Sequence, residues 1–117
     1  MFQMKRIYEA AEESDGKRVL TDRLWPRGVS KEKAKLDEWM KEIAPSTELR
    51  KSFCHDPEKF DQFREKYREE LQSEEKAEAV ESLKRKGAEG NVTLLYGAKD
   101  ETYNHAIVLK EFLEGKS

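Results

Sequence analysis

The segment VTLLYGA, residues 92–98, constrains the fold more than any other stretch of this 117-residue chain. Val92, Leu94, Leu95 and Tyr96 leave almost no polar alternation, and glycines bound the segment. A short apolar run between glycines is typical of a strand covered on both faces. Such a strand belongs inside an α/β domain, where other elements pack against each face of the sheet.

Two more strands and several helices complete the predicted order. Residues 5–10 and 17–22 have strand patterns, and the second is the more apolar. Helical patterns occupy 30–43, 46–53, 56–71 and 73–87, and a last helix is expected from about Thr102 to Glu114.

Capping signals support these helices. Ser30 can cap a helix with the apolar stripe Leu36, Trp39, Met40 and Ile43. Asp56 and Pro57 form the clearest helix start, which precedes the stripe Phe60, Phe63, Tyr67 and Leu71. The next helix is expected to pack Ala77, Val80 and Leu83 and to stop at Gly87, and Asp100 or Thr102 is the expected cap of the last helix.

This order predicts one α/β domain, residues 1–117, built as a small three-layer sandwich. Because helices separate 17–22 from 92–97, these two strands are expected to be parallel neighbours joined by a right-handed crossover. We expect a short mixed or parallel sheet of about three or more strands, flanked by about four or five helices.

The carboxyl ends of two parallel strands open on one edge of a sheet, where ligands bind in open α/β folds. The segments that leave this edge are TDRLWPRG, 21–28, and YGAKDETYNH, 96–105. Together they present the candidate site residues Asp22, Arg23, Trp25, Arg27, Tyr96, Lys99, Asp100, Asn104 and His105.

These residue types suit an anionic ligand. Guanidinium groups pair bidentately with phosphate or carboxylate, so Arg23, Arg27 and Lys99 are candidate anion contacts. Trp25 or Tyr96 would stack on the ligand or wall the pocket.

Proton chemistry is a second possibility at this edge. His105 is a candidate general acid or base, with Asp22 or Asp100 orienting it. Asn104 is a further candidate contact to the ligand. The same residues also have structural interpretations. Arg23 and Asp22 can form an ion pair, Trp25 can fill the core, and His105 can be a structural donor.

Composition narrows the classes of function. The net charge is −2, although the stretch 16–35 is locally basic, so binding to nucleic acid is not expected to be strong. No apolar run approaches the length of a membrane span, and no signal-peptide core is present. We expect a reduced, soluble, cytoplasmic protein that needs no cofactor and no metal.

Cys54 and His55 precede the Asp56 cap. The single cysteine excludes an intrachain disulfide and a cysteine metal cluster. A nucleophilic role at a helix start and a buried apolar role are both open for Cys54, and the second is preferred. The role of His55 stays open.

The segments RVLTDRLWPRGVSKE, LDEWMKEIAPSTELRKSF, HDPEKFDQFREKYREEL and VTLLYGAKDETYNHAIVLKEFL resemble the YeaO-like proteins of domain-of-unknown-function group 488. The resemblance covers about Lys5 to Leu113 and implies a single-domain cytoplasmic α/β protein of bacteria or archaea. Its signatures fall at 22–28 and at 98–101 with 104–106, and they overlap the two segments already singled out.

Three departures from the pattern of relatives matter. Cys54 stands where relatives often have glycine, which weakens a catalytic role for it. Tyr103 stands where relatives often have histidine, which argues against a paired-histidine metal site. Distant members carry a Cys-His-Arg element near this helix start, whereas Asn104 and His105 stand here without that cysteine.

Three functions remain as hypotheses. The first is an enzyme-like domain that binds a small anion, a nucleotide or a phosphorylated metabolite, in a cleft between 22–28 and 96–105. The second is a non-enzymatic nucleic-acid or protein interaction module that uses the stretch 16–35. The third is a homodimer with Trp25 buried against the partner.

Overall fold

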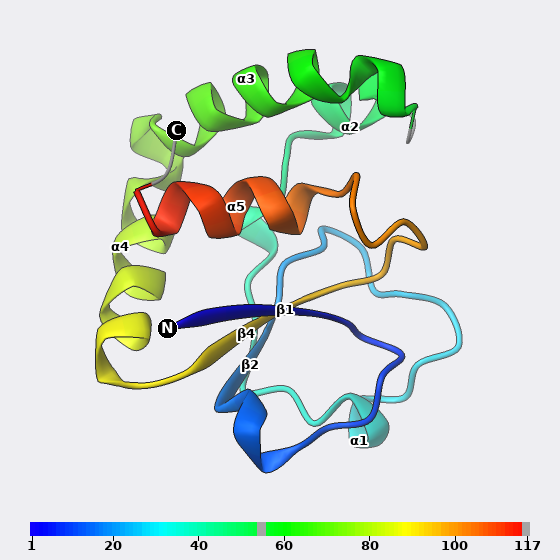
Figure 1. Ribbon diagram of the computed structural model, residues 1–117, viewed down its shortest axis with the longest axis vertical. Coiled ribbons are helices and arrows are strands. Elements are labelled where there is room, and N and C mark those ends of the chain that lie inside the picture. Colours follow the sequence, from blue (N-terminus) through cyan, green and yellow to red (C-terminus); the bar gives the residue numbers. More distant parts are fainter. Residues whose placement is uncertain (54–55, 116–117) are drawn as a thin grey trace.

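The computed structural model describes residues 1–53 and 56–115 of the chain (Figure 1). Its strands are β1 (Phe2–Arg6), β2 (Lys17–Leu20), β3 (Glu38–Trp39) and β4 (Val92–Tyr96). Its α-helices are α1 (Lys31–Ala34), α2 (Thr47–Phe53), α3 (Phe60–Leu71), α4 (Glu74–Glu89) and α5 (His105–Leu113). Short 3-10 helices occupy Glu13–Asp15, Lys41–Ile43 and Pro57–Lys59.

The four strands form one parallel sheet in the order β1-β4-β2-β3. Both Phe2 and Lys17 pair with Val92, and Val19 pairs with Glu38. Every residue of β4 is buried, as its apolar sequence predicts. The predicted parallel pairing of β2 and β4 is confirmed, and so is the α/β class.

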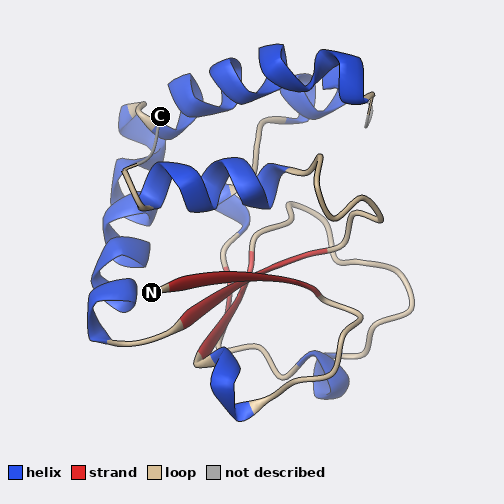
Figure 2. Cartoon of the chain, in the orientation of Figure 1, coloured by secondary structure: helices blue, strands red, loops and turns tan. Residues whose placement is uncertain are grey.

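Two apolar layers cover the sheet. Helices α2, α3, α4 and α5 gather on one face, while α1 and the loops around it lie on the other (Figure 2). The larger core joins one face of the strands to the helical layer through residues such as Val19, Leu94, Tyr67 and Leu109. The smaller core contains Ile7, Leu20, Ala34 and Leu95, with Trp25, Val29, Leu36 and Trp39 packed against it.

The start of α3 agrees with its capping signal. The Asp56 carboxylate accepts the Glu58 amide at 3.0 Å, and Pro57 occupies the first position of the 3-10 turn that leads into the helix. The predicted stripe Phe60, Phe63, Tyr67 and Leu71 is buried throughout. Cys54 and His55 lie outside the described residues, so the hypotheses about them stay predictions.

The helix predicted over 30–43 is wrong. Ser30 does cap a helix, but α1 ends after one turn because Lys35 adopts the left-handed conformation, with φ 47°. The chain then enters β3, where the Asp37 carboxylate accepts the Arg18 amide at 2.7 Å and Trp39 pairs with Leu20. These long-range bonds outweigh the helical spacing of the apolar residues.

Other boundaries also differ from the prediction. Strand β1 lies at 2–6 rather than 5–10, because the Glu9 carboxylate accepts the Arg6 amide and a turn follows. Helix α4 continues through Gly87, which packs against the ring of Phe2, and ends at Glu89. Within α4, Ala77 is exposed and Lys76 is buried instead.

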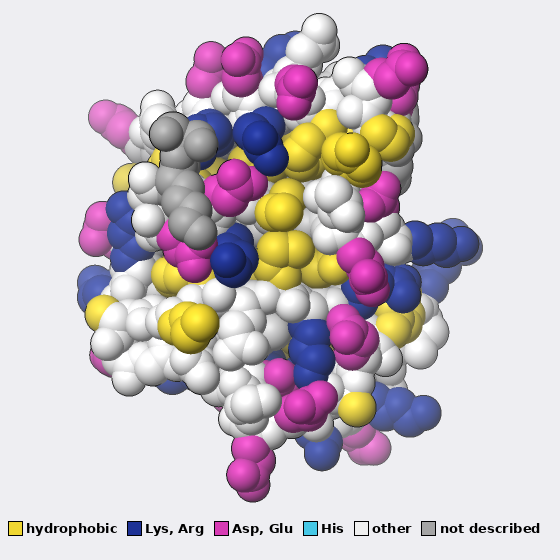
Figure 3. Space-filling model, viewed as in Figure 1, with side chains coloured by type: hydrophobic (Ala, Val, Ile, Leu, Met, Phe, Trp, Pro, Cys, Tyr) yellow, Lys and Arg dark blue, Asp and Glu magenta, His cyan; other side chains and the backbone are white. Residues whose placement is uncertain are grey.

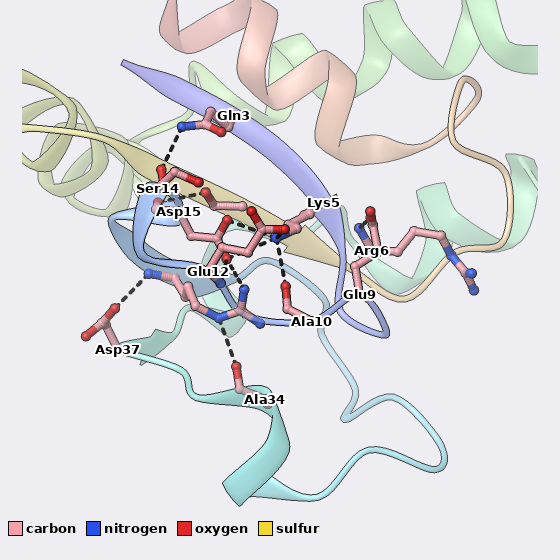
Figure 4. Close-up of polar contacts among 12 residues, drawn as sticks. Gln3, Lys5, Arg6, Glu9, Ala10, Glu12, Ser14, Asp15, Ala34 and Asp37 are labelled. Atoms are coloured by element: carbon pink, nitrogen blue, oxygen red, sulfur yellow. Dashed lines mark hydrogen bonds and ion pairs between the residues drawn. The ribbon is translucent and has the colours of Figure 1, made fainter.

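A buried ionic network links β1 to β2 at the smaller core (Figure 4). The Asp15 carboxylate accepts hydrogen bonds from Lys5 Nζ at 3.0 Å and from Arg18 Nη1, and the Arg18 Nε donates to the Ala34 carbonyl at 3.0 Å. Burial raises the pKa of Asp15, but the Glu12 amide, Lys5 and Arg18 outweigh it and hold the pKa below its ordinary value.

Candidate functional site

A pocket of about 560 Å³ lies where the loops that follow β2 and β4 meet α2 and the first residue of α5. Six of the residues singled out from the sequence line it: Asp22, Arg23, Trp25, Arg27, Lys99 and His105. The remaining lining residues are Tyr8, Leu24, Pro26, Ala44, Pro45, Arg50, Phe53, Phe63, Gly97 and Ala98. The pocket therefore opens at the carboxyl ends of the parallel strands, as the topology predicts.

Asp22 connects the two loops at the floor of the pocket. Its Oδ2 accepts the Gly97 amide at 2.9 Å, and its Oδ1 lies 3.3 Å from His105 Nε2. An added Cβ at Gly97 would lie 2.8 Å from Asp22 Oδ2, so this close approach requires glycine. Of the two carboxylates expected to orient His105, Asp22 is the one within ion-pair distance of it among the described residues.

The environment of His105 determines where its ring carries hydrogen. Nε2 lies 3.0 Å from Thr21 Oγ1 and 3.2 Å from the Thr21 carbonyl, in addition to the Asp22 contact. The Thr21 hydroxyl donates to the Leu95 carbonyl at 2.9 Å, so its oxygen presents lone pairs to the imidazole. Nε2 is thus surrounded by acceptors and carries the hydrogen.

Three of the candidate residues, Tyr96, Asp100 and Asn104, do not line the pocket. The Asn104 side chain caps α5 by accepting the Ile107 amide at 3.0 Å, and it donates to the Asp100 carbonyl. Asp100 Oδ1 accepts the amides of Thr102 and Tyr103. Tyr96 is buried in β4, and burial raises the pKa of its hydroxyl. The helix therefore starts at His105 and not near Thr102.

Arg23 is held by carbonyl groups and not by Asp22. Its guanidinium donates to Ala44 O and Pro45 O at 3.3 to 3.4 Å, which are long hydrogen bonds. Among the residues that the structure describes, no ion pair joins Arg23 to a carboxylate. The interpretation of Arg23 as a structural partner of Asp22 is therefore not supported.

Four cations line the pocket: Arg23, Arg27, Arg50 and Lys99. Across 1–53 and 56–115, none of them forms an ion pair, whereas Lys5, Arg18 and several surface cations do. Asp22 is the one carboxylate among the described lining residues. Figure 3 shows Lys and Arg side chains projecting on the right, where the loops 21–30 and 97–104 lie. The pocket therefore has an excess of positive charge.

Arg50 was not found from the sequence. It lies on α2, next to Leu49 and Lys51, and no local pattern separates it from the other charged residues of that helix. Only the placement of α2 beside the sheet edge brings Arg50 to the pocket.

Buried and half-buried polar side chains fix the segment 42–46, which carries the pocket residues Ala44 and Pro45. Lys76 Nζ donates to the carbonyls of Glu42 and Ala44 at 2.8 Å, and the Tyr67 hydroxyl donates to Ile43 O at 2.6 Å. The Glu70 carboxylate accepts the Ser46 amide and hydroxyl. Burial raises the pKa of Tyr67 well above its ordinary value and lowers the pKa of Lys76.

A family model described as the inactive DUF488-N3 subclade matches residues 1–117. The chain belongs to the DUF488 family. This DUF488 protein is 50% identical over 112 residues to YeaO of Escherichia coli strain K12, described as uncharacterized, and the match covers 95% of each chain. It is 38% identical over 111 residues to an uncharacterized protein of Mycobacterium tuberculosis strain H37Rv, covering 95% of this chain and 92% of that relative. No solved structure matches it significantly.

Within its described residues, this DUF488 protein has no group of three or more His, Cys, Asp or Glu side chains arranged to hold a metal ion. Its described helices also include none with the length and apolar character needed to cross a bilayer.

Proposed function

We propose that this DUF488 protein binds a small anionic ligand, a nucleotide or a phosphorylated metabolite, in the pocket between 22–28 and 97–105. The observation that carries the proposal is the set of four cations around one pocket without an ion pair to any described residue. Four cations around a pocket with a single lining carboxylate, Asp22, leave an excess of positive charge that favours an anion there. Guanidinium groups match phosphate oxygens bidentately.

The apolar wall supports a ligand with an organic part. Trp25, Leu24 and Pro26 line the same pocket as the cations, and the Trp25 indole N–H is already bonded to Val29 O at 2.7 Å. The volume of about 560 Å³ lies within the range of pockets that hold small molecules. Trp25 would therefore contribute contact area to the ligand rather than a hydrogen bond.

Binding without turnover is the form of the proposal that we favour. The matching subclade is described as inactive, and Asn104 and His105 stand without the cysteine found in distant members of the group. The Nε2 hydrogen of His105 points at oxygens of Thr21 and Asp22, which suits a positioning role for this ring.

The test is a thermal-shift and calorimetric screen with inorganic phosphate, adenosine monophosphate and glucose 6-phosphate at low ionic strength. At least one probe should raise the unfolding midpoint by several degrees at saturation. Arg23→Ala should abolish the shift with an unchanged midpoint for the unliganded protein, because its own contacts are long carbonyl bonds.

Lys33→Ala is the matched control, since Lys33 is an exposed cation of α1 that does not line the pocket. It should bind like the parent. The absence of binding for all three probes in the parent, or an equal loss in both variants, would contradict the proposal.

Proton transfer to a bound ligand is the second candidate, favoured by the 3.3 Å contact between His105 and Asp22 at the pocket floor. It predicts release of phosphate or another product from a bound probe. Such turnover should disappear in His105→Gln while binding of the probe remains. A parent protein that binds a probe and leaves it unchanged would exclude this candidate for that ligand.

A further inference from the structure

We propose that the pocket is built for a ligand with two linked phosphoryl groups, one held on each side of the Asp22–His105 floor. The inference rests on the proposed anion binding and specifies its ligand class. It follows from how the four cations are distributed over the elements that line the pocket.

Arg23 and Arg50 lie on the α2 side. The Arg23 guanidinium is directed to the carbonyls of Ala44 and Pro45, and α2 begins two residues after Pro45. Arg50 follows within the first turns of that helix and lines the same pocket. This side therefore offers two guanidinium groups, which together suit one phosphoryl group.

Arg27 and Lys99 lie on the side of β1 and β4. The Tyr8 hydroxyl donates a hydrogen bond to the Arg27 carbonyl at 2.9 Å. The Arg6 guanidinium lies 4.9 Å from the centre of the Tyr8 ring, and its Nε donates to the Ala98 carbonyl at 2.9 Å. These contacts connect the backbones that carry Arg27 and Lys99. Both side chains are exposed and line the pocket.

The floor of the pocket carries the opposite charge, where Asp22 joins the loop that carries Arg23 to the loop that carries Lys99 through Gly97. Asp22 is tied to Gly97 and His105 there, so its carboxylate cannot move away without breaking those contacts. A single anionic group placed at the centre would meet this carboxylate, whereas two groups placed at the sides would each meet a cation pair. Charge complementarity therefore favours a ligand with two anionic groups.

The covalent connection between the two phosphoryl groups raises the affinity of the ligand. Once one phosphoryl group is bound, the second reaches the other cation pair as an intramolecular event at high effective concentration. Inorganic pyrophosphate is the simplest probe with this property, and inorganic phosphate is its unlinked counterpart.

The experiment is calorimetric titration of the parent, Arg50→Ala, Lys99→Ala and the control Lys33→Ala with both probes, at equal ionic strength and without divalent cations. We expect pyrophosphate to bind the parent with a stoichiometry of one and at least about tenfold more tightly than phosphate. Either pocket variant should reduce this preference to below about threefold while phosphate still binds, and the control should keep it. Because Arg50 and Lys99 are exposed, neither substitution is expected to unfold the protein. The unfolding midpoint of each variant without ligand checks this.

Equal affinities for phosphate and pyrophosphate in the parent would overturn the two-group inference and leave the proposed anion binding intact. A preference that survives in both variants would also overturn it. Absence of binding for both probes and for the organic phosphates would overturn the proposed function itself.

Discussion

The Gly97 amide and the Asp22 carboxylate form a 2.9 Å hydrogen bond between the loops that follow β4 and β2. The same carboxylate lies 3.3 Å from His105 at the start of α5. One short side chain therefore ties together three elements that are remote in sequence, and the geometry of the pocket depends on that connection.

Gly97→Ala is expected to disturb this connection. The added Cβ would lie 2.8 Å from Asp22 Oδ2 and 3.3 Å from Pro26, so the two loops must separate. We expect a loss of about 1–2 kcal/mol in the free energy of unfolding and weaker phosphate binding. Urea denaturation and calorimetry measure the two effects.

Gly90→Ala is the control for this prediction, because nothing lies within 4 Å of a Cβ added there. It should leave stability and binding near those of the parent. Equal behaviour of the two alanine variants would show that the approach of Asp22 to Gly97 is not a constraint on the pocket.

Asn104→Ala should destabilise the protein by about 1–2 kcal/mol, because α5 loses its side-chain cap at Ile107. Asn104→Ser should retain most of that stability, since serine caps helices comparably. Neither variant should change phosphate affinity in the folded protein, because Asn104 does not line the pocket. A normal midpoint with lost binding in Asn104→Ser would instead make Asn104 a ligand contact.

The strand edge was predictable because its signals are local. The apolar run at 92–96 and the breakers Pro26 and Gly28 are sequence patterns, and the parallel pairing of β2 with β4 follows from the helices between them. That pairing is sufficient to bring Arg23 and Lys99 to one pocket.

The rest of the fold and of the site depends on tertiary contacts that no short stretch of the sequence reveals. The stripe from Leu36 to Ile43 fits a helix, yet the bond from the Trp39 indole to Asp22 O at 2.7 Å and the pairing with β2 place this segment in the sheet. Arg50 reaches the pocket only through the packing of α2. Lys76 reaches the supporting segment 42–46 only through the packing of α4.

Trp25→Ala tests the hypothesis of a homodimer interface. The Trp25 ring packs against Trp39 at 5.2 Å between ring centres, within the smaller core of one chain. We expect a loss of about 2 kcal/mol in stability and no change in the mass measured by light scattering. Trp25→Phe should recover part of the stability. A dimeric parent that becomes monomeric in Trp25→Ala would favour the interface instead.

The Asp15 network should make stability depend on pH at the acid side. The pKa of Asp15 is lowered in the folded protein below its ordinary value of 3.8, so the unfolded chain binds the proton more readily. The stabilisation is therefore fully present above about pH 5 and is lost as the pH falls through 3.8 towards the folded pKa.

Asp15→Asn should cost about 3 kcal/mol at neutral pH, because it leaves Arg18 buried and Lys5 beside it without their shared carboxylate. Its difference from the parent should shrink as the pH is lowered from 5 to 3, because the unfolded parent chain then takes up a proton at Asp15 and the parent loses this stabilisation. Urea denaturation at several pH values measures this difference. Glu13→Gln, at the exposed neighbouring acidic residue, should follow the parent at every pH. A difference between Asp15→Asn and the parent that stays constant from pH 7 to pH 3 would mean that the charge of Asp15 does not stabilise the fold.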